Sequence, residues 1–146
     1  MNKKSFTLAE LMIATLILVM GLMGILVTYV RCIELDEISA KSFDTLQAMR
    51  DVVENIRNTP YNEIFPTFSN QNFVINGIPG MGTIYIDNTN PRLMGIQVVF
   101  CLKLSKGYIL GEDRNLNGIL DKNEDLNKND QIDSPLKLFT LLFYRK

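Results

Sequence analysis

The stretch that decides the fold is residues 11–30, LMIATLILVMGLMGILVTYV, a run of 20 residues without a formal charge. A helix of this length, at ~1.5 Å rise per residue, spans the ~30 Å hydrocarbon core of a bilayer. Lys3 and Lys4 precede the run, whereas Glu34, Asp36 and Glu37 follow it. Because positive residues favour the cytoplasmic side, the amino end is predicted to be cytoplasmic and the remainder of the chain extracytoplasmic.

A cleaved secretory signal is an alternative interpretation of this segment. The apolar run is longer than the ~7–15 residues of a signal-peptide core, and no A-x-A-like site of small residues follows it. Lipoprotein processing at Cys32 is disfavoured because Arg31 stands where a small residue is expected. We therefore expect the segment to stay in the mature protein and to contact membrane lipid.

The composition of the whole chain excludes several classes of function. The 146 residues hold 15 Lys and Arg against 16 Asp and Glu, so no global basic field favours direct nucleic-acid binding. The sequence has no His, which removes the usual general base near neutral pH. We therefore expect that the chain is not an enzyme. Cys32 and Cys101 lack metal-site spacing and are expected to be independent thiols.

An acidic residue stands at the start of the apolar run. The sequence over residues 4–10 is KSFTLAE, which places Glu10 directly before Leu11. An acidic residue at the centre of a membrane helix costs ~2.5–3.5 kcal/mol, and somewhat less near an end. Glu10 is therefore a functional candidate that requires a partner.

This amino-terminal sequence closely resembles the prepilin cleavage and methylation motif of type IV pilins and type II secretion pseudopilins. In that family, a short basic leader is removed at the cytoplasmic face, before a Phe that becomes the N-methylated first residue. The resemblance implies a leader over residues 1–5, cleavage between Ser5 and Phe6, and N-methylation of Phe6. The family's usual residue before the cut is Gly, where this chain has Ser5.

The resemblance also implies a role for Glu10 and a set of partners. Glu10 occupies the position of the family's assembly glutamate, which pairs with the terminal ammonium of a neighbouring subunit in low dielectric. The implied partners are prepilin peptidase, other pilin or pseudopilin subunits and the inner-membrane assembly platform. The stretch GLMGIL over residues 21–26 is similar to that of PilV-like minor pilins. The expected location is the inner (cytoplasmic) membrane as a single-pass protein, then a pilus or pseudopilus filament.

The helical pattern continues past the apolar run, so one helix is predicted from Phe6 to about Asn58. Pro60 ends it, because the residue before a proline is pushed out of the helical region. Residues 6–31 form the half that spans the membrane or the filament core, and residues 32–59 form an amphipathic half. The apolar positions of the second half are Ile38, Phe43, Leu46, Met49, Val52, Val53 and Ile56.

Residues 60–146 are predicted to form a carboxy-terminal β-sheet domain. Alternating patterns over residues 83–87 and 93–104 indicate a hairpin, a turn at 105–107 leads to residues 108–110, and residues 136–144 form a final apolar strand. Residues 61–82 are interpreted as the connection from helix to sheet. The last strand is apolar on both faces, which favours a central place in the sheet or contact with a neighbouring subunit. The predicted fold class is α+β, and the resemblance implies a pilin-like long helix packed on a small antiparallel sheet.

An acidic insert over residues 112–134 separates two apolar strands, and its first part matches an EF-hand-type calcium loop. In such a loop alternate side chains converge on one ion, Gly118 permits the sharp turn, and a bidentate carboxylate closes the shell. The candidate ligands at positions 1, 3, 5, 7, 9 and 12 are Asp113, Asn115, Asn117, Ile119 (through its carbonyl), Asp121 and Glu124.

The pattern returns twelve residues later in an imperfect copy. Asp130 replaces the turn glycine, and Leu136 stands where the closing carboxylate belongs. Because Asp can adopt the left-handed conformation the turn is retained, but the missing ligand predicts a weaker or shared site. The candidate ligands of the second loop are Asp125, Asn127, Asn129, Gln131 and Asp133.

The insert resembles the calcium repeats of dockerins and thrombospondin type 3 segments. We expect one or two structural Ca²⁺ ions, because a loop of this length without metal would be unusually long and its like charges would repel. The alternative is a solvated loop that binds nothing.

Two functions from different classes remain. The first is a structural subunit, a minor pilin or pseudopilin, of a type IV pilus-like or type II secretion filament. The second is a membrane-anchored extracytoplasmic calcium-binding protein that does not polymerise. Glu10 and the junction between Ser5 and Phe6 discriminate between them, because an anchor requires neither.

Overall fold

The computed structural model describes residues 7–90 and 92–144, and its first element is the long helix α1, Leu8–Arg57. The predicted leader, Ser5 and Phe6 lie outside the described residues. Helix α1 ends three residues before Pro60, which agrees with the sequence prediction. The chain divides into two compact units, Met1–Ser39 and Ala40–Lys146, and α1 runs through the boundary.

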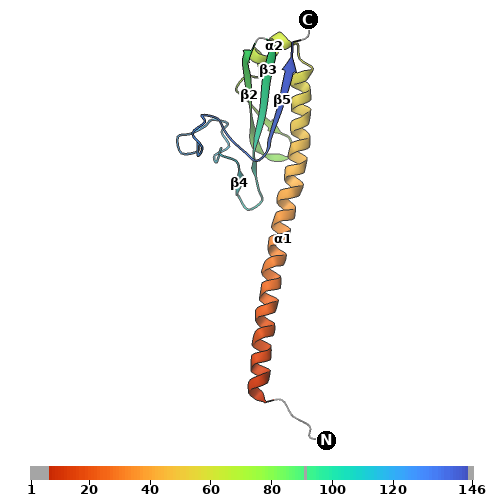
Figure 1. The fold of residues 1–146 in the computed structure, drawn as a ribbon, viewed down its shortest axis with the longest axis vertical. Coiled ribbons are helices and arrows are strands. Elements are labelled where there is room, and N and C mark those ends of the chain that lie inside the picture. The colour runs from red at the N-terminus through yellow and green to blue at the C-terminus, as the bar shows by residue number, and fades with distance from the viewer. Residues whose placement is uncertain (1–6, 91, 145–146) are drawn as a thin grey trace. The chain divides into compact units, whose positions relative to one another are not determined.

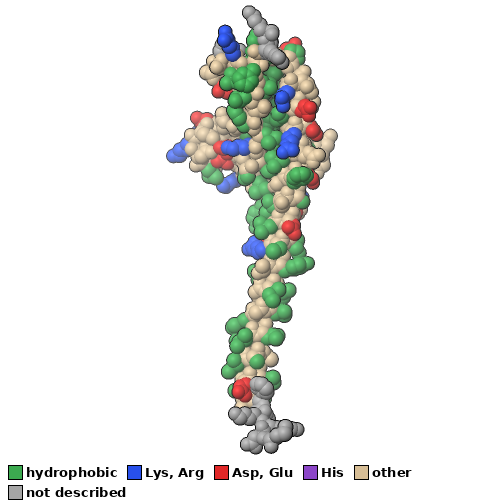
Figure 2. Space-filling view, turned by 45° about the vertical axis from the view of Figure 1, so that its right-hand side comes forward, with side chains coloured by type: hydrophobic (Ala, Val, Ile, Leu, Met, Phe, Trp, Pro, Cys, Tyr) green, Lys and Arg blue, Asp and Glu red, His purple; other side chains and the backbone are tan. Residues whose placement is uncertain are grey.

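The first unit is the apolar part of α1. Its large hydrophobic side chains are exposed on all sides, and Figure 2 shows them along this part of the helix. By length and composition α1 could cross a membrane, with a mean hydropathy of 2.6 in its most apolar window. Its length and composition make this helix a candidate membrane anchor. A signal sequence or the core helix of a soluble protein can have the same length and composition.

The second unit uses one face of the carboxy-terminal part of α1. Met49 and Ile56 are fully buried, as the sequence pattern predicts. The prediction for Phe43 is wrong, because its side chain is 67% exposed, and the buried residue of that turn is Thr45. Thr45 is tolerated there because its hydroxyl donates to the Lys41 carbonyl oxygen at 2.6 Å.

The prediction that residues 61–82 form a plain connection is also wrong. A short helix, α2 (Tyr61–Phe68), follows Pro60 directly, and strand β1 (Gln71–Ile75) begins three residues after it. A turn at Asn76 and Gly77 then leads into strand β2 (Ile78–Asn90), which starts earlier than predicted. Pro60 therefore ends one helix and begins the next, since its fixed φ also suits a helix start.

The sheet is antiparallel and is built around β3 (Leu93–Lys103). On one side β3 pairs with β2, which pairs with β1, and on the other side it pairs with β4 (Ile109–Leu110) and β5 (Lys137–Phe143). Figure 1 shows β2, β3 and β5 side by side next to the carboxy-terminal part of α1. Strand β5 is therefore an edge strand, which corrects the interpretation that it is central.

The core lies between the helices and one face of β3. Alternate residues of β3 are at most 3% exposed, namely Met94, Ile96, Val98, Phe100 and Leu102. Gly82 of β2 allows Phe73 to pack against Phe100, with ring centroids 5.9 Å apart. A Cβ at residue 82 would lie 2.3 Å from the Phe73 ring, so a larger residue there would displace this aromatic pair.

Candidate functional site

The amino end of α1 is closed by a reciprocal cap between Thr7 and Glu10. The Thr7 backbone N–H and hydroxyl both donate to Glu10 Oε2 at 2.9 Å, and the Glu10 N–H donates to Thr7 Oγ1 at 3.3 Å. This arrangement is a capping box, which satisfies backbone donors that a helix start leaves free. The Glu10 carboxylate thus has a local partner within its own chain.

The insert between β4 and β5 is fixed to the sheet through a second, smaller core. Ile132 of the insert is 2% exposed and packs with Val99 and Cys101, on the face of β3 opposite Phe100. The Ile132 N–H donates to the hydroxyl oxygen of Tyr85 at 2.8 Å, and burial raises the pKa of that tyrosine. Partly buried hydrophobic residues complete this core: Tyr85, Ile109, Leu116 and Leu120.

The first loop turns its oxygens inward through a chain of short-range hydrogen bonds. Asp113 accepts from the N–H groups of Asn117 (3.1 Å) and Gly118 (2.8 Å). Asn115 Oδ1 accepts from the Asn117 N–H at 2.9 Å, and Asn117 Oδ1 accepts from the Ile119 N–H at 2.7 Å. Gly118 adopts φ +73°, and a Cβ there would lie 2.2 Å from Asn72 of β1. The turn and this close approach both require glycine.

The carboxylates of Asp121 and Glu124 also accept hydrogen bonds within the first loop. Asp121 Oδ2 accepts from the Nδ2 atoms of Asn115 (2.7 Å) and Asn117 (3.3 Å). Glu124 Oε1 accepts from the Arg114 N–H at 2.8 Å, and its Oε2 accepts from the Asp121 N–H at 3.4 Å. The hydrogen bonds therefore join the side chains at positions 3, 5 and 9, whereas the carboxylates at positions 1 and 12 accept from backbone N–H groups of the same loop.

The second loop repeats this geometry without the glycine. Asp125 accepts from the N–H groups of Asn129 (3.2 Å) and Asp130 (3.2 Å), and Asp130 itself adopts φ +58°. Asn127 Oδ1 accepts from the Asn129 N–H at 3.1 Å, and Asn129 Oδ1 accepts from the Gln131 N–H at 2.9 Å. Asp130 thus makes the turn that the sequence predicts for it.

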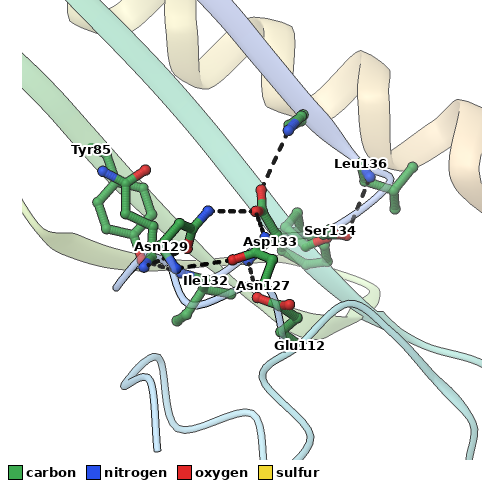
Figure 3. Close-up of polar contacts among 11 residues, drawn as sticks. Tyr85, Glu112, Asn127, Asn129, Ile132, Asp133, Ser134 and Leu136 are labelled. Carbon is green, nitrogen blue, oxygen red and sulfur yellow. Dashed lines mark hydrogen bonds and ion pairs between the residues drawn. The ribbon is translucent and has the colours of Figure 1, made fainter. Parts of the chain in front are cut away.

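Asp133 occupies position 9 of the second loop, where Figure 3 shows it between Asn127 and Asn129. Its Oδ2 accepts from Asn127 Nδ2 at 2.6 Å and Asn129 Nδ2 at 2.8 Å, and Lys137 Nζ lies 3.3 Å from its Oδ1. Partial burial acts to raise the pKa of Asp133, but these three donors outweigh it and lower the pKa below its ordinary value.

Glu112 is a residue of the insert to which the sequence analysis gives no role. It is 9% exposed, and its carboxylate accepts from the N–H groups of Leu126 (Oε1, 3.2 Å) and Asp133 (Oε2, 3.1 Å). Leu136, at position 12 of the second loop, is 4% exposed and belongs to the hydrophobic interior. A twelve-residue repeat in the sequence points to Glu112. The dipeptides Glu112-Asp113 and Glu124-Asp125 begin equivalent segments, so Glu112 corresponds to Glu124.

Three buried carboxylates of the insert have no ion-pair partner among the described residues. Asp113 is 1% exposed and Glu124 is 6% exposed, and neither they nor Glu112 form an ion pair with a basic side chain within residues 7–90 and 92–144. Burying a carboxylate without a cation is costly, even where backbone N–H groups solvate it. A divalent cation with oxygen ligands would offset this charge.

The donor set is chemically suited to Ca²⁺, which prefers six to eight oxygen ligands from carboxylates, amides and carbonyls. In the described part of the chain, no three His, Cys, Asp or Glu side chains form a group that could hold a metal by themselves. The candidate ligand sets of both loops depend in addition on Asn side chains, and on a backbone carbonyl at position 7.

Comparison of the chain with known protein families, curated proteins and solved structures found no match.

Proposed function

We propose that this chain is a structural subunit of a type IV pilus-like or type II secretion filament, a minor pilin or pseudopilin. The observation that carries the proposal is the KSFTLAE sequence directly ahead of the apolar part of α1. A basic leader, a small residue, Phe6 and Glu10 stand in the order that resembles the prepilin motif. The α+β fold, with a long helix and a small antiparallel sheet, is compatible with this role.

In this proposal the protein is first a single-pass protein of the inner membrane, with its sheet domain outside. Prepilin peptidase removes residues 1–5, and the assembly platform transfers the subunit from lipid to the filament. The exposed side chains of the first unit then pack against sibling helices. The Glu10 carboxylate exchanges its capping contacts with Thr7 for the terminal ammonium of a neighbouring subunit, a pair strengthened by low dielectric.

The proposed role of the insert is that of a calcium-dependent clamp on the sheet domain. The inward-turned oxygens and the buried, uncompensated carboxylates support this role. Ile132 of the second loop packs against Val99 and Cys101 of β3. Ordering the loops would therefore also stabilise the packing on this face of the sheet. The metal would act structurally and not in catalysis.

One observation favours the second function, a calcium-binding anchor that does not polymerise. The capping box gives Glu10 a structural role within its own helix, which needs no neighbouring subunit. A permanent anchor would also leave residues 1–5 attached.

The deciding experiment is mass spectrometry of the mature amino terminus after coexpression with a prepilin peptidase. We expect a chain that begins at Phe6, with and without one added methyl group. Coexpression with a catalytically inactive peptidase is the control and should leave the chain intact. An intact chain with the active enzyme would refute the filament role and leave the anchor, whereas cleavage near Ala40 would remove residues 11–30 and refute both.

A further inference from the structure

A groove crosses the sheet from β5 over β3 and β2 to the turn between α2 and β1. Its volume is about 550 Å³, which is within the range of small-molecule sites. Three of its lining residues pair across neighbouring strands: Tyr85 of β2, Gln97 of β3 and Phe139 of β5. The Tyr85 hydroxyl accepts from the Ile132 N–H at 2.8 Å, which holds the tyrosine in place (Figure 3). The groove is therefore built on paired strands and not on a loop alone.

Gly95 leaves the middle of this groove open. A Cβ at residue 95 would lie 3.5 Å from Phe139 Cε2 and 3.6 Å from the Cβ of Asp87. These are ordinary van der Waals distances, so an alanine would fit there and would occupy the space between the two side chains. The Phe139 side chain is 67% exposed beside this space. An exposed aromatic ring at the edge of a groove offers a flat apolar surface on which a ligand can stack.

The groove also presents polar groups that the protein itself does not use. It is lined by four side-chain amides: Asn70, Asn88, Gln97 and Gln131. Among the described residues, none of these four amides forms a hydrogen bond with another residue. Each amide offers two donors and an acceptor. An apolar ligand would take water from these groups without replacing its hydrogen bonds, so the lining favours a ligand that has polar groups of its own.

The charge of the lining restricts the ligand further. None of the described residues that line the groove is Lys or Arg, and Asp87 is its one acidic residue. Hydrogen bonds from the Thr89 hydroxyl and N–H lower the pKa of Asp87, so its carboxylate is charged near neutral pH. An anionic ligand would meet this carboxylate without a compensating cation. The lining therefore disfavours phosphate groups and acidic sugars.

We propose that this groove binds a neutral oligosaccharide. A sugar ring has an apolar C–H face, which stacks on the Phe139 ring, and hydroxyl groups at its rim, which donate and accept hydrogen bonds as the amides do. The groove offers both kinds of contact within one site. This binding function goes beyond the structural role proposed above, and it depends neither on cleavage of the leader nor on bound calcium.

The test is binding of the full chain to an array of oligosaccharides. Neutral members built from hexoses and N-acetylhexosamines stand beside uronic-acid members of the same length. The chain is kept in zwitterionic detergent, because a maltoside headgroup would itself be a ligand of the proposed class. Calcium is present throughout, so that the state of the insert, which carries Gln131, does not vary. We expect binding to neutral members and none to the uronic-acid members.

Three variants locate the site, with the neutral member that binds best as the probe in a titration by saturation-transfer NMR. Phe139→Ala should weaken its affinity by about tenfold, as truncation of a central aromatic side chain commonly does. Gly95→Ala should weaken it by a similar factor, because the methyl group fills the space beside the ring without a clash. Phe143→Ala is the matched control, since it removes a ring of similar exposure from the same strand but outside the groove. It should bind as wild type does.

The proposal is overturned if no neutral oligosaccharide of the array binds, or if the uronic-acid members bind as tightly. Binding of Phe139→Ala and Gly95→Ala within twofold of wild type would also overturn it, and so would an equal loss in Phe143→Ala. Circular dichroism first establishes that each variant is folded, and if Phe139→Ala is not, Gly95→Ala decides. The filament role is tested separately by the mature amino terminus, so its failure is distinguishable from the failure of this site.

Discussion

Glu10 has a structural role at the start of α1, and the proposed function gives it a second role in assembly. It closes the capping box with Thr7, so replacement by Ala would remove the cap and the charge together. Gln also functions at this position of a capping box, and therefore Glu10→Gln removes the charge alone. Thr7→Ala is the complementary change, which costs about 1 kcal/mol of helix capping and keeps the carboxylate.

The first prediction follows from this pair of variants. Glu10→Gln should insert into the membrane normally but fail to enter filaments, because the terminal ammonium of the neighbour loses its partner. Thr7→Ala should insert and assemble. The measurement is immunoblotting of membrane and sheared filament fractions. Normal incorporation of Glu10→Gln would show that the charge of Glu10 is incidental to assembly.

The reactivity of the Cys101 thiol can be used to measure whether the insert stays packed on the sheet. Its side chain is 1% exposed beneath Ile132, and burial raises the pKa of its thiol to about 11, against opposing backbone hydrogen bonds from Asp113 and Glu112. In a Cys32→Ser variant, alkylation by iodoacetamide near neutral pH should therefore be slow with calcium present. A chelator should speed it, because the loops that cover Cys101 lose their clamp.

The control for this second prediction is the same variant in guanidinium chloride, which should label completely. Labelling is measured by mass spectrometry of the intact chain over time. Equal rates in calcium and in chelator would mean that the insert covers Cys101 without help from metal.

At the scale of elements, the sheet selects which face of α1 is buried. Met49 is fully buried, whereas Phe43 is 67% exposed, although both belong to the apolar pattern. Met49→Ala should destabilise the sheet domain by about 2–5 kcal/mol, because it leaves a cavity in the core. Phe43→Ala should change the free energy of unfolding by no more than about 0.5 kcal/mol. Denaturant titration of the full chain in micelles measures both, and equal losses would contradict the burial of this face.

The position of strand β5 in the sheet does not follow from its apolar composition. Its outward side chains Phe139 and Phe143 are 67% and 73% exposed, and the strand pairs with β3 alone. An apolar edge strand is a hazard for aggregation in a free monomer.

At the scale of the whole molecule, the proposed clamp would link calcium binding to folding. A calcium ion bound only by the folded state adds RT ln(1 + [L]/Kd), or ~2.7 kcal/mol at a hundredfold excess over Kd. The full chain in micelles should therefore melt at a higher temperature in calcium than in chelator. Magnesium should substitute poorly, because it demands a more regular shell than a mixed set of oxygens provides.

Substitutions at position 1 of each loop, Asp113 and Asp125, test this prediction separately for the two loops. Asp113→Ala should remove most of the calcium-dependent gain in melting temperature, because it opens the loop that has its own glycine and closing carboxylate. Asp125→Ala should remove less, since Lys137 lies 3.3 Å from Asp133 and opposes a cation there. Identical melting temperatures in calcium and in chelator, measured by circular dichroism, would show that the insert is a solvated loop without a calcium-dependent role.

The sequence by itself determined the features that depend on neighbours along the chain. The uncharged run over residues 11–30 fixed the helix and its capacity to span a membrane, because helical hydrogen bonds and hydropathy are local. The turn at Gly118 is local for the same reason, since the candidate ligands of the first loop lie within twelve residues. The turn at Ser105–Gly107 was likewise evident, and it closes with the Gly107 N–H donating to the Leu104 carbonyl oxygen.

Only the tertiary structure decided the features that depend on residues far apart in sequence. Thr45, and not Phe43, is buried because the sheet determines which side of the helix loses water. Strand β5 is at an edge because pairing to β3 leaves no partner strand beyond it among the described residues. The Glu112 carboxylate accepts from the Asp133 N–H, 21 residues later in the chain, because folding the repeat back on itself sets its first residue against its last loop. The loop pattern would require a carboxylate at residue 136, where the chain has Leu136, and the fold buries that side chain in the hydrophobic interior.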